Sequence, residues 1–286
     1  MNILVTGAKG QLGSEIQVES DAYKEYNFFF EDSKSLDITQ SEIIKNYITE
    51  HNISVVINCA AYTAVDKAES EIEKAEAVNV LGVKNILLAL VKVKNSKLIH
   101  ISTDYVFNGT NHIPYKETDD VDPIGIYGKT KRVGEELILN SMIDGIIIRT
   151  SWVYSSFGNN FVKTMMRLGE ERENLNVIFD QIGSPTYAKD LANLCLFLLD
   201  KDFQNRSKIY HYSNEGVLSW YDFAKCIMEL ANIDCEINPI ETKDYPTPAK
   251  RPNYSLLNKS RIKEDFDIEI PYWKDSLKEC IKIIQN

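Results

Sequence analysis

Two side chains that could perform acid–base chemistry, Tyr127 and Lys131, lie four residues apart in the sequence. A predicted helix over residues 125–140 would place both on one face. A free tyrosine has a pKa of about 10 and is a poor acid or base at neutral pH. We expect the ammonium group of Lys131 to favour the phenolate and to lower the pKa of Tyr127 toward the working range. Because an isolated pair of this kind is usually part of a solvated helix, its interpretation depends on the other motifs.

Three glycines, Gly7, Gly10 and Gly13, follow a short apolar run at residues 3–5. Such a run is typical of a buried parallel strand. Glycines let the backbone turn sharply and approach a pyrophosphate, whose charge is met by the N-terminus of the following helix. The strand, glycine loop and helix together predict a dinucleotide site, and the alternative is a glycine-rich turn that binds no ligand.

The second predicted strand, residues 28–30, ends in an acidic pair that includes Asp32. A carboxylate there can accept hydrogen bonds from the adenosine ribose of a dinucleotide, and it disfavours the 2′-phosphate of NADP. Lys34 has the opposite effect, so the choice between NADH and NADPH stays open. The apolar patch that contains Asp37 and Ile38 could line the adenine.

Further apolar strands are predicted at residues 55–59, 98–101 and 146–148, and they alternate with helices. This alternation specifies an α/β fold with a doubly wound parallel sheet, the Rossmann fold. Ligands bind at the carboxyl ends of such strands. Gly7, Ala61 and Thr103 each follow a strand, so we expect them to line one crevice. Ser102 should point away from that crevice if Thr103 points into it, because successive side chains on a strand alternate.

Two polar residues inside apolar segments have more ordinary interpretations. His100 is flanked by apolar residues of a strand and is expected to be a hydrogen-bonded core histidine rather than a ligand. Asn79 interrupts a mostly apolar helical stretch, where we expect an amide to face solvent or to cap a kink.

The character of the sequence changes after Arg149, where short strands and helices replace the regular alternation. We therefore predict two domains: residues 1–150 bind the dinucleotide, and residues 151–286 form mainly a smaller mixed α/β substrate lobe. Segments of the second part could return to the first. Three prolines form a rigid loop around Arg251.

Composition excludes several classes of function. The formal net charge of −10 disfavours nucleic acid as the main partner, because such binding requires clustered cations. The five cysteines are scattered and contain no CxxC pair, so neither a disulfide framework nor a zinc site is expected. No apolar run approaches the length of a membrane span, and the N-terminus lacks the layout of a signal peptide. We expect a cytoplasmic protein.

With these residues assembled, the sequence resembles the extended short-chain dehydrogenase/reductases, and within them the enzymes that reduce dTDP-linked 4-keto-6-deoxy sugars. The resemblance runs nearly from end to end and rests on the motifs at Gly7–Gly13, Ala60–Glu69, Ser102–Phe107, Tyr127–Lys131, Arg149–Tyr154, Gly158–Phe161, Asp180–Thr186 and Tyr245–Pro252. It implies NAD(P)H-dependent reduction of the C4 ketone of dTDP-4-dehydro-L-rhamnose to dTDP-L-rhamnose, a step in making surface polysaccharide.

The resemblance also assigns roles to individual residues. It implies that Tyr127 donates the proton, that Lys131 holds the nicotinamide ribose and tunes the tyrosine, and that Thr103 hydrogen-bonds the substrate oxygen. Thr103, Asp104 and Trp152 would contact the sugar nucleotide. The residues at positions matching the cofactor site are Gly7, Gly10, Gln11, Leu12, Gly13, Asp32, Asp37, Ile38, Ala61, Tyr62, Thr63, Tyr127 and Lys131.

Two assignments are less direct. The substrate's diphosphate needs a cationic contact, for which Arg251 is the candidate, and a surface salt bridge is the equal alternative for this residue. Some members of the family bind a magnesium ion through acidic residues at a dimer contact. Glu15 matches one such position, so Mg²⁺ and a homodimer are open expectations.

Other functions remain open on this scaffold. The chain could be a reductase or an epimerase that acts on another nucleotide-linked 4-keto sugar. It could instead be a non-catalytic regulatory subunit that binds the cofactor. The presence of Thr103, Tyr127 and Lys131 favours an enzyme, because a pure binding subunit could lose them.

Overall fold

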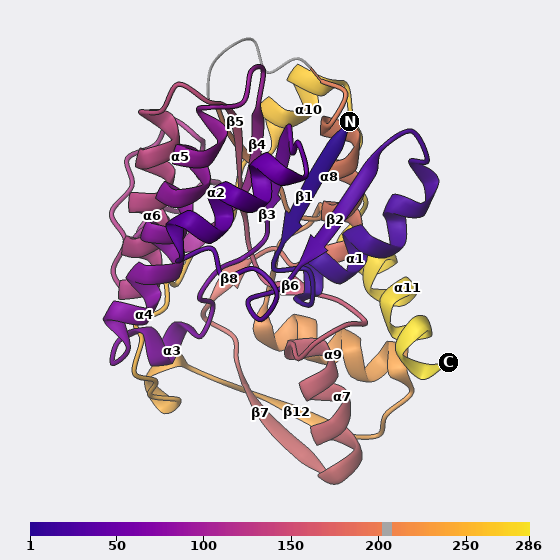
Figure 1. Ribbon diagram of the computed structural model, residues 1–286. Helices are drawn as coiled ribbons and strands as arrows, with labels where there is room; N and C mark the ends of the chain where they lie inside the picture. Colours follow the sequence, from indigo (N-terminus) through magenta and orange to yellow (C-terminus); the bar gives the residue numbers. More distant parts are fainter. Residues whose placement is uncertain (202–207) are drawn as a thin grey trace.

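The computed structural model describes residues 1–201 and 208–286 (Figure 1). Six strands of this described part form a parallel sheet in the order β10-β5-β4-β3-β1-β2. Their bounds are β1 (Asn2–Thr6), β2 (Asn27–Glu31), β3 (Val55–Asn58), β4 (Lys97–Thr103), β5 (Asp144–Thr150) and β10 (Lys208–His211). The predicted doubly wound parallel sheet is confirmed.

Helices cover both faces of the sheet because its strands are apolar on both sides. Leu4 of β1 packs with α2 (Ser41–Glu50), α5 (Val83–Leu90) and α6 (Ile126–Leu139) on one face. Its neighbours Ile3 and Val5 point to the opposite face. There they pack with α1 (Gln11–Glu19), α8 (Ala188–Leu198) and α10 (Ser260–Phe266). The two helical layers lie on either side of the sheet in Figure 1.

The strand order reverses direction at β1. From β1 the chain first adds β2 on one side and then returns to place β3 on the other. The loops after β1 and β3 therefore diverge and leave a crevice between them at the carboxyl ends of the strands. Ligands of open α/β sheets bind at such switch points.

A second, smaller lobe lies beyond the carboxyl ends of the strands (Figure 1). It contains α7 (Phe161–Glu171), α9 (Trp220–Ala231) and α11 (Trp273–Gln285), with β7 (Asn174–Ile178) paired in parallel to β12 (Glu236–Ile240). Its apolar core is separate from the two cores that flank the sheet. The predicted mixed α/β lobe is confirmed.

Short elements connect these layers. Two-residue strand pairs join β6 (Val153–Tyr154) to β9 (Thr186–Tyr187), and β8 (Ile182–Gly183) to β11 (Leu218–Ser219). The remaining elements are η1 (Ser20–Ala22), α3 (Val65–Ala68), α4 (Ile72–Glu76), η2 (Ala77–Gly82), η3 (Asp104–Val106) and η4 (Thr242–Asp244).

Segments from the second half of the chain complete the main sheet. β10 pairs in parallel with β5, with Ile209 opposite Ile147, and α8 packs on the same face as α1. One of the short strands expected after Arg149 is therefore the edge strand of the main sheet. The domain division at residue 150 stays a prediction.

Within residues 1–201 and 208–286, no helix combines the length and the apolar character needed to cross a membrane.

Candidate functional site

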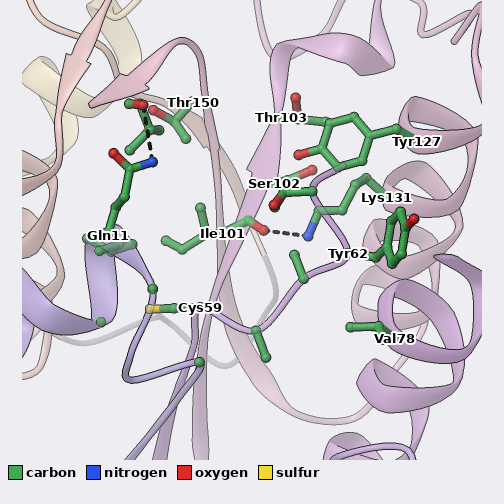
Figure 2. Close-up of a pocket in the computed structure, with 18 of the residues that line it drawn as sticks. Gln11, Cys59, Tyr62, Val78, Ile101, Ser102, Thr103, Tyr127, Lys131 and Thr150 are labelled. Carbon is green, nitrogen blue, oxygen red and sulfur yellow. Dashed lines mark hydrogen bonds between the residues drawn. The ribbon is translucent and has the colours of Figure 1, made fainter. Parts of the chain in front are cut away.

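A cleft of ≈ 880 Å³ lies at the carboxyl ends of the sheet strands. Figure 2 shows part of it, with Gln11 and Thr150 on one side and Thr103, Tyr127 and Lys131 on the other. The predicted cofactor residues that line the cleft are Gly7, Gly10, Gln11, Leu12, Gly13, Asp32, Asp37, Ile38, Ala61, Tyr62, Thr63, Tyr127 and Lys131. The predicted substrate residues that line it are Thr103, Asp104 and Trp152. Glu15 and Arg251 lie outside this lining.

The glycine loop after β1 is packed too closely for side chains. Gly7 has φ +68, and a Cβ there would lie 2.7 Å from the backbone nitrogen of Ala60. A Cβ at Gly13 would lie 2.5 Å from the carbonyl oxygen of Gly7. Gly10 is the N-cap residue of α1 and has no side chain that could bind the first backbone N–H groups. The first turn of the helix has no acidic residue. The loop therefore presents backbone N–H groups at a helix N-terminus, which fits a pyrophosphate.

Asp32 organises the turn after β2. One carboxylate oxygen accepts hydrogen bonds from the backbone N–H groups of Lys34 (2.8 Å) and Ser35 (3.1 Å), and the other pairs with Lys9. The contact with Lys9 and these backbone bonds lower the pKa of Asp32 to about 2. The acid and the exposed Lys9 share this edge of the cleft, so the charges do not choose between NADH and NADPH.

The predicted catalytic residues come together from two elements. Thr103 ends β4, and Tyr127 and Lys131 lie one turn apart on α6. The hydroxyl of Tyr127 is hydrogen-bonded to Thr103, and the two side chains lie next to each other in Figure 2. Ser102 donates a hydrogen bond to the buried carboxylate of Glu135 (2.6 Å). The hydroxyl of Ser102 is therefore hydrogen-bonded within the protein interior, whereas that of Thr103 lies beside Tyr127.

The predicted lowering of the pKa of Tyr127 is wrong for this structure. Burial raises the pKa to about 12, the hydrogen bond with Thr103 opposes this in part, and the nearby Asp104 adds to it. The ammonium group of Lys131 does not lower this pKa, and its Nζ donates to the carbonyl oxygen of Ile101 (2.7 Å). Sequence spacing correctly placed the two residues on one helix face but did not show where the ammonium group is bound.

Lys131 is buried, with 1% of its surface exposed. Besides Ile101, its Nζ lies 3.2 Å from Nε2 of His100. Burial lowers the pKa of Lys131 to about 8, and the charge of Glu135, one turn further along α6, opposes this shift. His100 is itself buried and hydrogen-bonded, as expected for a core histidine.

Asn79 has a role that the sequence analysis missed. The expectation that it faces solvent or caps a kink is wrong, because it is 1% exposed and lies within the π-helical η2. Its Oδ1 accepts from the backbone N–H of Tyr62 (2.9 Å), and its Nδ2 donates to the Tyr62 carbonyl (3.3 Å) and to Thr130 (3.0 Å). Asn79 thus pairs with the Tyr62 backbone as a strand would and fixes the loop after β3. The signal in the sequence was an amide within an apolar helical stretch, and the structure adds that this stretch is a π-helical turn of the kind common at functional sites.

Asn85 makes a similar connection six residues further along the same stretch. Its Nδ2 donates to the carbonyl oxygens of Ile38 (2.9 Å) and Thr39 (3.0 Å). Asn79 and Asn85 therefore attach two separate loops of the cleft, those after β3 and β2, to one helical stretch.

Asp104 is a buried carboxylate that lines the cleft beside Thr103. Thr103 Oγ1 donates to its Oδ1 over 3.1 Å. Burial raises the pKa of Asp104 to about 6, although hydrogen bonds from neighbouring groups partly oppose the shift. The carboxylate is therefore costly to keep ionised, and its buried Oδ2 has no hydrogen-bond partner among the residues that the structure describes.

Trp152 follows β5 in an unusual backbone conformation, with φ +49. Its indole stacks on Trp220 with ring centroids 3.7 Å apart. A Cβ at Gly183 would lie 2.9 Å from the indole, so Gly183 also packs closely against this ring. Positive φ in a bulky residue is strained and is often found at functional sites. The flanking contacts hold the ring at the edge of the cleft.

Arg251 forms a salt bridge, which was one of the two roles expected for it. Its terminal nitrogens donate to Asp66 Oδ1 (3.1 Å) and Oδ2 (2.7 Å), and one of them also donates to Thr247. This bidentate pair joins the C-terminal loop to α3, 185 residues away in sequence. A contact between Arg251 and a substrate diphosphate stays a prediction.

Glu15 is buried and accepts a hydrogen bond from the hydroxyl of Ser155 (2.6 Å). Burial raises its pKa. In the described part of the chain, no group of three or more His, Cys, Asp or Glu side chains is placed to hold a metal ion. The structure therefore gives no support to the expected magnesium site at Glu15.

Replacing Asn79 with alanine tests its role in holding the loop after β3. We expect Asn79→Ala to lower the free energy of unfolding by about 1–3 kcal/mol, because buried hydrogen-bonding groups lose their partner. Hydrogen exchange at the Tyr62 amide should accelerate. The matched control is Asn85→Ala, which should leave the Tyr62 amide protected. Unchanged protection of Tyr62 in Asn79→Ala would show that other contacts hold this loop.

The buried carboxylate of Asp104 should make stability depend on pH. The pKa of Asp104 in the folded protein, about 6, exceeds the ordinary value of 3.8. Below pH 3.8 the carboxyl is protonated and its ionisation does not lower the free energy of unfolding, whereas above pH 6 the ionised group lowers it most. We expect Asp104→Asn to become more stable relative to the parent as the pH rises through this window, by up to about 3 kcal/mol. Denaturant unfolding at several pH values measures this difference. The exposed-site control Asp21→Asn should show no such trend, and a flat difference for Asp104→Asn would contradict the assignment.

Comparison with known proteins identifies the family of this chain. The family model described as "RmlD substrate binding domain" matches residues 1–286. A dTDP-4-dehydrorhamnose reductase of Aggregatibacter actinomycetemcomitans is 42% identical, and the alignment covers 96% of this chain and 97% of the relative. The spore coat polysaccharide biosynthesis protein SpsK of Bacillus subtilis is 41% identical, with 98% and 96% covered.

Solved structures agree with these relatives. A dTDP-4-dehydrorhamnose reductase of Clostridium acetobutylicum superposes with a TM-score of 0.94 at 42% identity and covers 100% of both chains. A Bacillus anthracis enzyme of the same name, in complex with NADP, gives a TM-score of 0.93 at 38% identity, with 100% and 99% covered. Across its whole length, from the glycine loop to the last helix, the chain belongs to the dTDP-4-dehydrorhamnose reductase family of extended short-chain dehydrogenase/reductases.

Proposed function

We propose that this protein reduces the C4 ketone of dTDP-4-dehydro-L-rhamnose to dTDP-L-rhamnose, with NADPH or NADH as the hydride donor. The observation that carries the proposal is the group formed by Thr103, Tyr127 and Lys131 in a cleft that also contains the glycine loop. Membership of the family makes the chain an oxidoreductase, and the names of its relatives supply the substrate.

The residues at the nucleotide end fit a dinucleotide. Side chains at Gly7 and Gly13 would collide with the backbone, so the loop keeps the open path that a pyrophosphate needs. Both Asp32 and Lys131 line the cleft; in this proposal Asp32 binds the adenosine ribose and Lys131 the nicotinamide ribose. When bound, the reduced nicotinamide supplies the hydride, and the protein supplies position and protons.

Tyr127 is the proposed acid. As hydride reaches C4, negative charge develops on the carbonyl oxygen, and a hydroxyl within hydrogen-bond reach can transfer its proton there. The raised pKa of Tyr127 keeps the phenol protonated at neutral pH, which is the form that reduction requires. Thr103 supplies a second hydroxyl for the same oxygen. Lys131 would hold the nicotinamide ribose beside this phenol.

The product fits the synthesis of surface polysaccharide. The Bacillus subtilis relative is named for spore coat polysaccharide biosynthesis. Sugar nucleotides for such polymers are made inside the cell, and the scattered free cysteines agree with a reducing cytoplasm. We therefore place the enzyme in the cytoplasm.

A panel of substrates tests the reaction against its alternatives. We expect NADPH or NADH oxidation to be fastest with dTDP-4-dehydrorhamnose and at least tenfold slower with UDP- or GDP-linked 4-keto sugars. Absorbance of the reduced nicotinamide measures the rate. A faster reaction with another nucleotide would assign the enzyme to that sugar. No oxidation with any of these substrates, together with intact cofactor binding, would identify a regulatory subunit.

Replacing Tyr127 with phenylalanine tests the proton donor. We expect Tyr127→Phe to lower kcat by about 10²–10⁴-fold, the usual contribution of general acid–base catalysis, while the Kd for NADPH changes little. The matched control is Tyr221→Phe on α9, outside the residues that line the cleft, which should keep the parent rate. A Tyr127→Phe enzyme that is nearly as active as the parent would show that another group supplies the proton.

A further inference from the structure

A chain of buried polar groups leads from Lys131 away from the cleft and across three strands. Nζ of Lys131 lies 3.2 Å from Nε2 of His100, and Nδ1 of His100 lies 3.0 Å from the side-chain amide of Asn58. In the structure Nδ2 of that amide faces His100, and its Oδ1 accepts a hydrogen bond from the hydroxyl of Thr6 over 2.7 Å. The four residues Lys131, His100, Asn58 and Thr6 are each at most 1% exposed. The proposed reaction uses Lys131 and gives no role to the other three.

The imidazole of His100 is neutral. Burial holds its pKa well below the ordinary value, and the positive charge of Lys131 acts in the same direction. A neutral imidazole has one N–H donor and one acceptor nitrogen. If the nitrogen that faces Lys131 is the acceptor, the nitrogen that faces Asn58 must therefore be the N–H donor, and the reverse.

Two arrangements are compatible with the distances between Lys131, His100 and Asn58. In the first, charged Lys131 donates to Nε2, and Nδ1–H of His100 donates to the amide oxygen of Asn58. In the second, neutral Lys131 accepts from Nε2–H, and the amide NH₂ of Asn58 donates to Nδ1. Both are sterically equivalent, because the oxygen and nitrogen of an amide occupy the same space and only hydrogen bonding distinguishes them.

The surroundings of Lys131 favour the charged form. Its Nζ donates to the carbonyl oxygen of Ile101 over 2.7 Å, and the ionised Glu135 lies one turn further along the same helix. An ammonium group has no acceptor site, so Nε2 of His100 must be the acceptor. Nδ1 then carries the proton. The amide of Asn58 must therefore be turned relative to the structure, so that its oxygen faces His100 and its NH₂ faces the hydroxyl of Thr6.

We propose that His100 is a positioning residue for the reduction: Asn58 holds it as the Nδ1–H tautomer, and its Nε2 accepts a hydrogen bond from the ammonium group of Lys131. The inference rests on the proposed function for the task that it assigns to Lys131. Of the three N–H groups on Nζ, one points to Ile101 and one to His100. The third is left for the cleft, on the side where Tyr127 lies (Figure 2).

The tautomer can be measured on the parent protein by nitrogen NMR with ¹⁵N-labelled histidine. The chain has four histidines, and His51→Gln and His112→Gln remove the two that are not buried. His211 is an internal reference for the same pattern, because its Nδ1 lies 3.1 Å from the carbonyl oxygen of Tyr115 and its Nε2 faces Arg149. We expect both remaining imidazoles to be Nδ1–H tautomers at pH 7. An Nε2–H tautomer at His100 would overturn the proposal.

Kinetics separates positioning from simple packing. His100→Leu removes the acceptor at similar size, whereas His100→Gln can still offer an oxygen to Lys131. We expect His100→Leu to lower kcat about tenfold or more, with substantial recovery in His100→Gln. The groups that face Lys131 are His100 on β4, Cys59 after β3, and Tyr127 and Glu135 on α6.

Because His100→Leu leaves the ammonium with one acceptor fewer, the alkaline limb of its kcat profile should move to lower pH. Equal losses in the two variants with an unmoved alkaline limb would show a packing role only. Should neither variant fold, the tautomer measurement decides. That measurement needs no turnover, so an Nδ1–H imidazole in a protein that reduces no 4-keto sugar would refute the proposed function alone. An Nε2–H imidazole in an active reductase would refute this inference alone.

Discussion

The burial of one positive charge, the ammonium group of Lys131, constrains the centre of this molecule. A buried charge that lacks partners costs several kcal/mol, so the surrounding elements must supply acceptors. β4 supplies the Ile101 carbonyl oxygen at 2.7 Å and the ring of His100 at 3.2 Å. α6 supplies the carboxylate of Glu135 one turn away. The relative position of strand and helix is therefore fixed at the point where Thr103 and Tyr127 meet.

Glu135 carries this constraint further into the fold. Its carboxylate is fully buried, accepts two hydrogen bonds from Arg149 (2.8 and 2.7 Å) and a third from Ser102 (2.6 Å). Burial opposes its ionisation, but the pair with Arg149 keeps its pKa below the ordinary value. Because Arg149 lies on β5, one carboxylate links α6, β4 and β5 beneath the cleft. Replacing one partner of such a pair is far more damaging than removing both.

The two halves of the chain are interleaved rather than placed end to end. β10 and α8 come from the second half but complete the sheet and the helical layer on α1. The ion pair between Asp66 and Arg251 ties the C-terminal loop back to the first half. These returns hold the smaller lobe over the carboxyl ends of the strands, so the cleft has walls from both parts.

The sequence alone determined the parallel sheet, the glycine loop, the common position of Gly7, Ala61 and Thr103 at the strand ends, and the shared helix face of Tyr127 and Lys131. These follow from local spacing: apolar runs form strands, parallel strands end on one edge, and residues four apart share a helix face. Tertiary structure alone decided which groups bind each other. Asn79 with Tyr62, and Lys131 with Ile101 and His100, pair across 17 to 31 residues. The raised pKa of Tyr127 likewise comes from burial by distant segments, because desolvation depends on what surrounds a group in space and not on its neighbours in sequence.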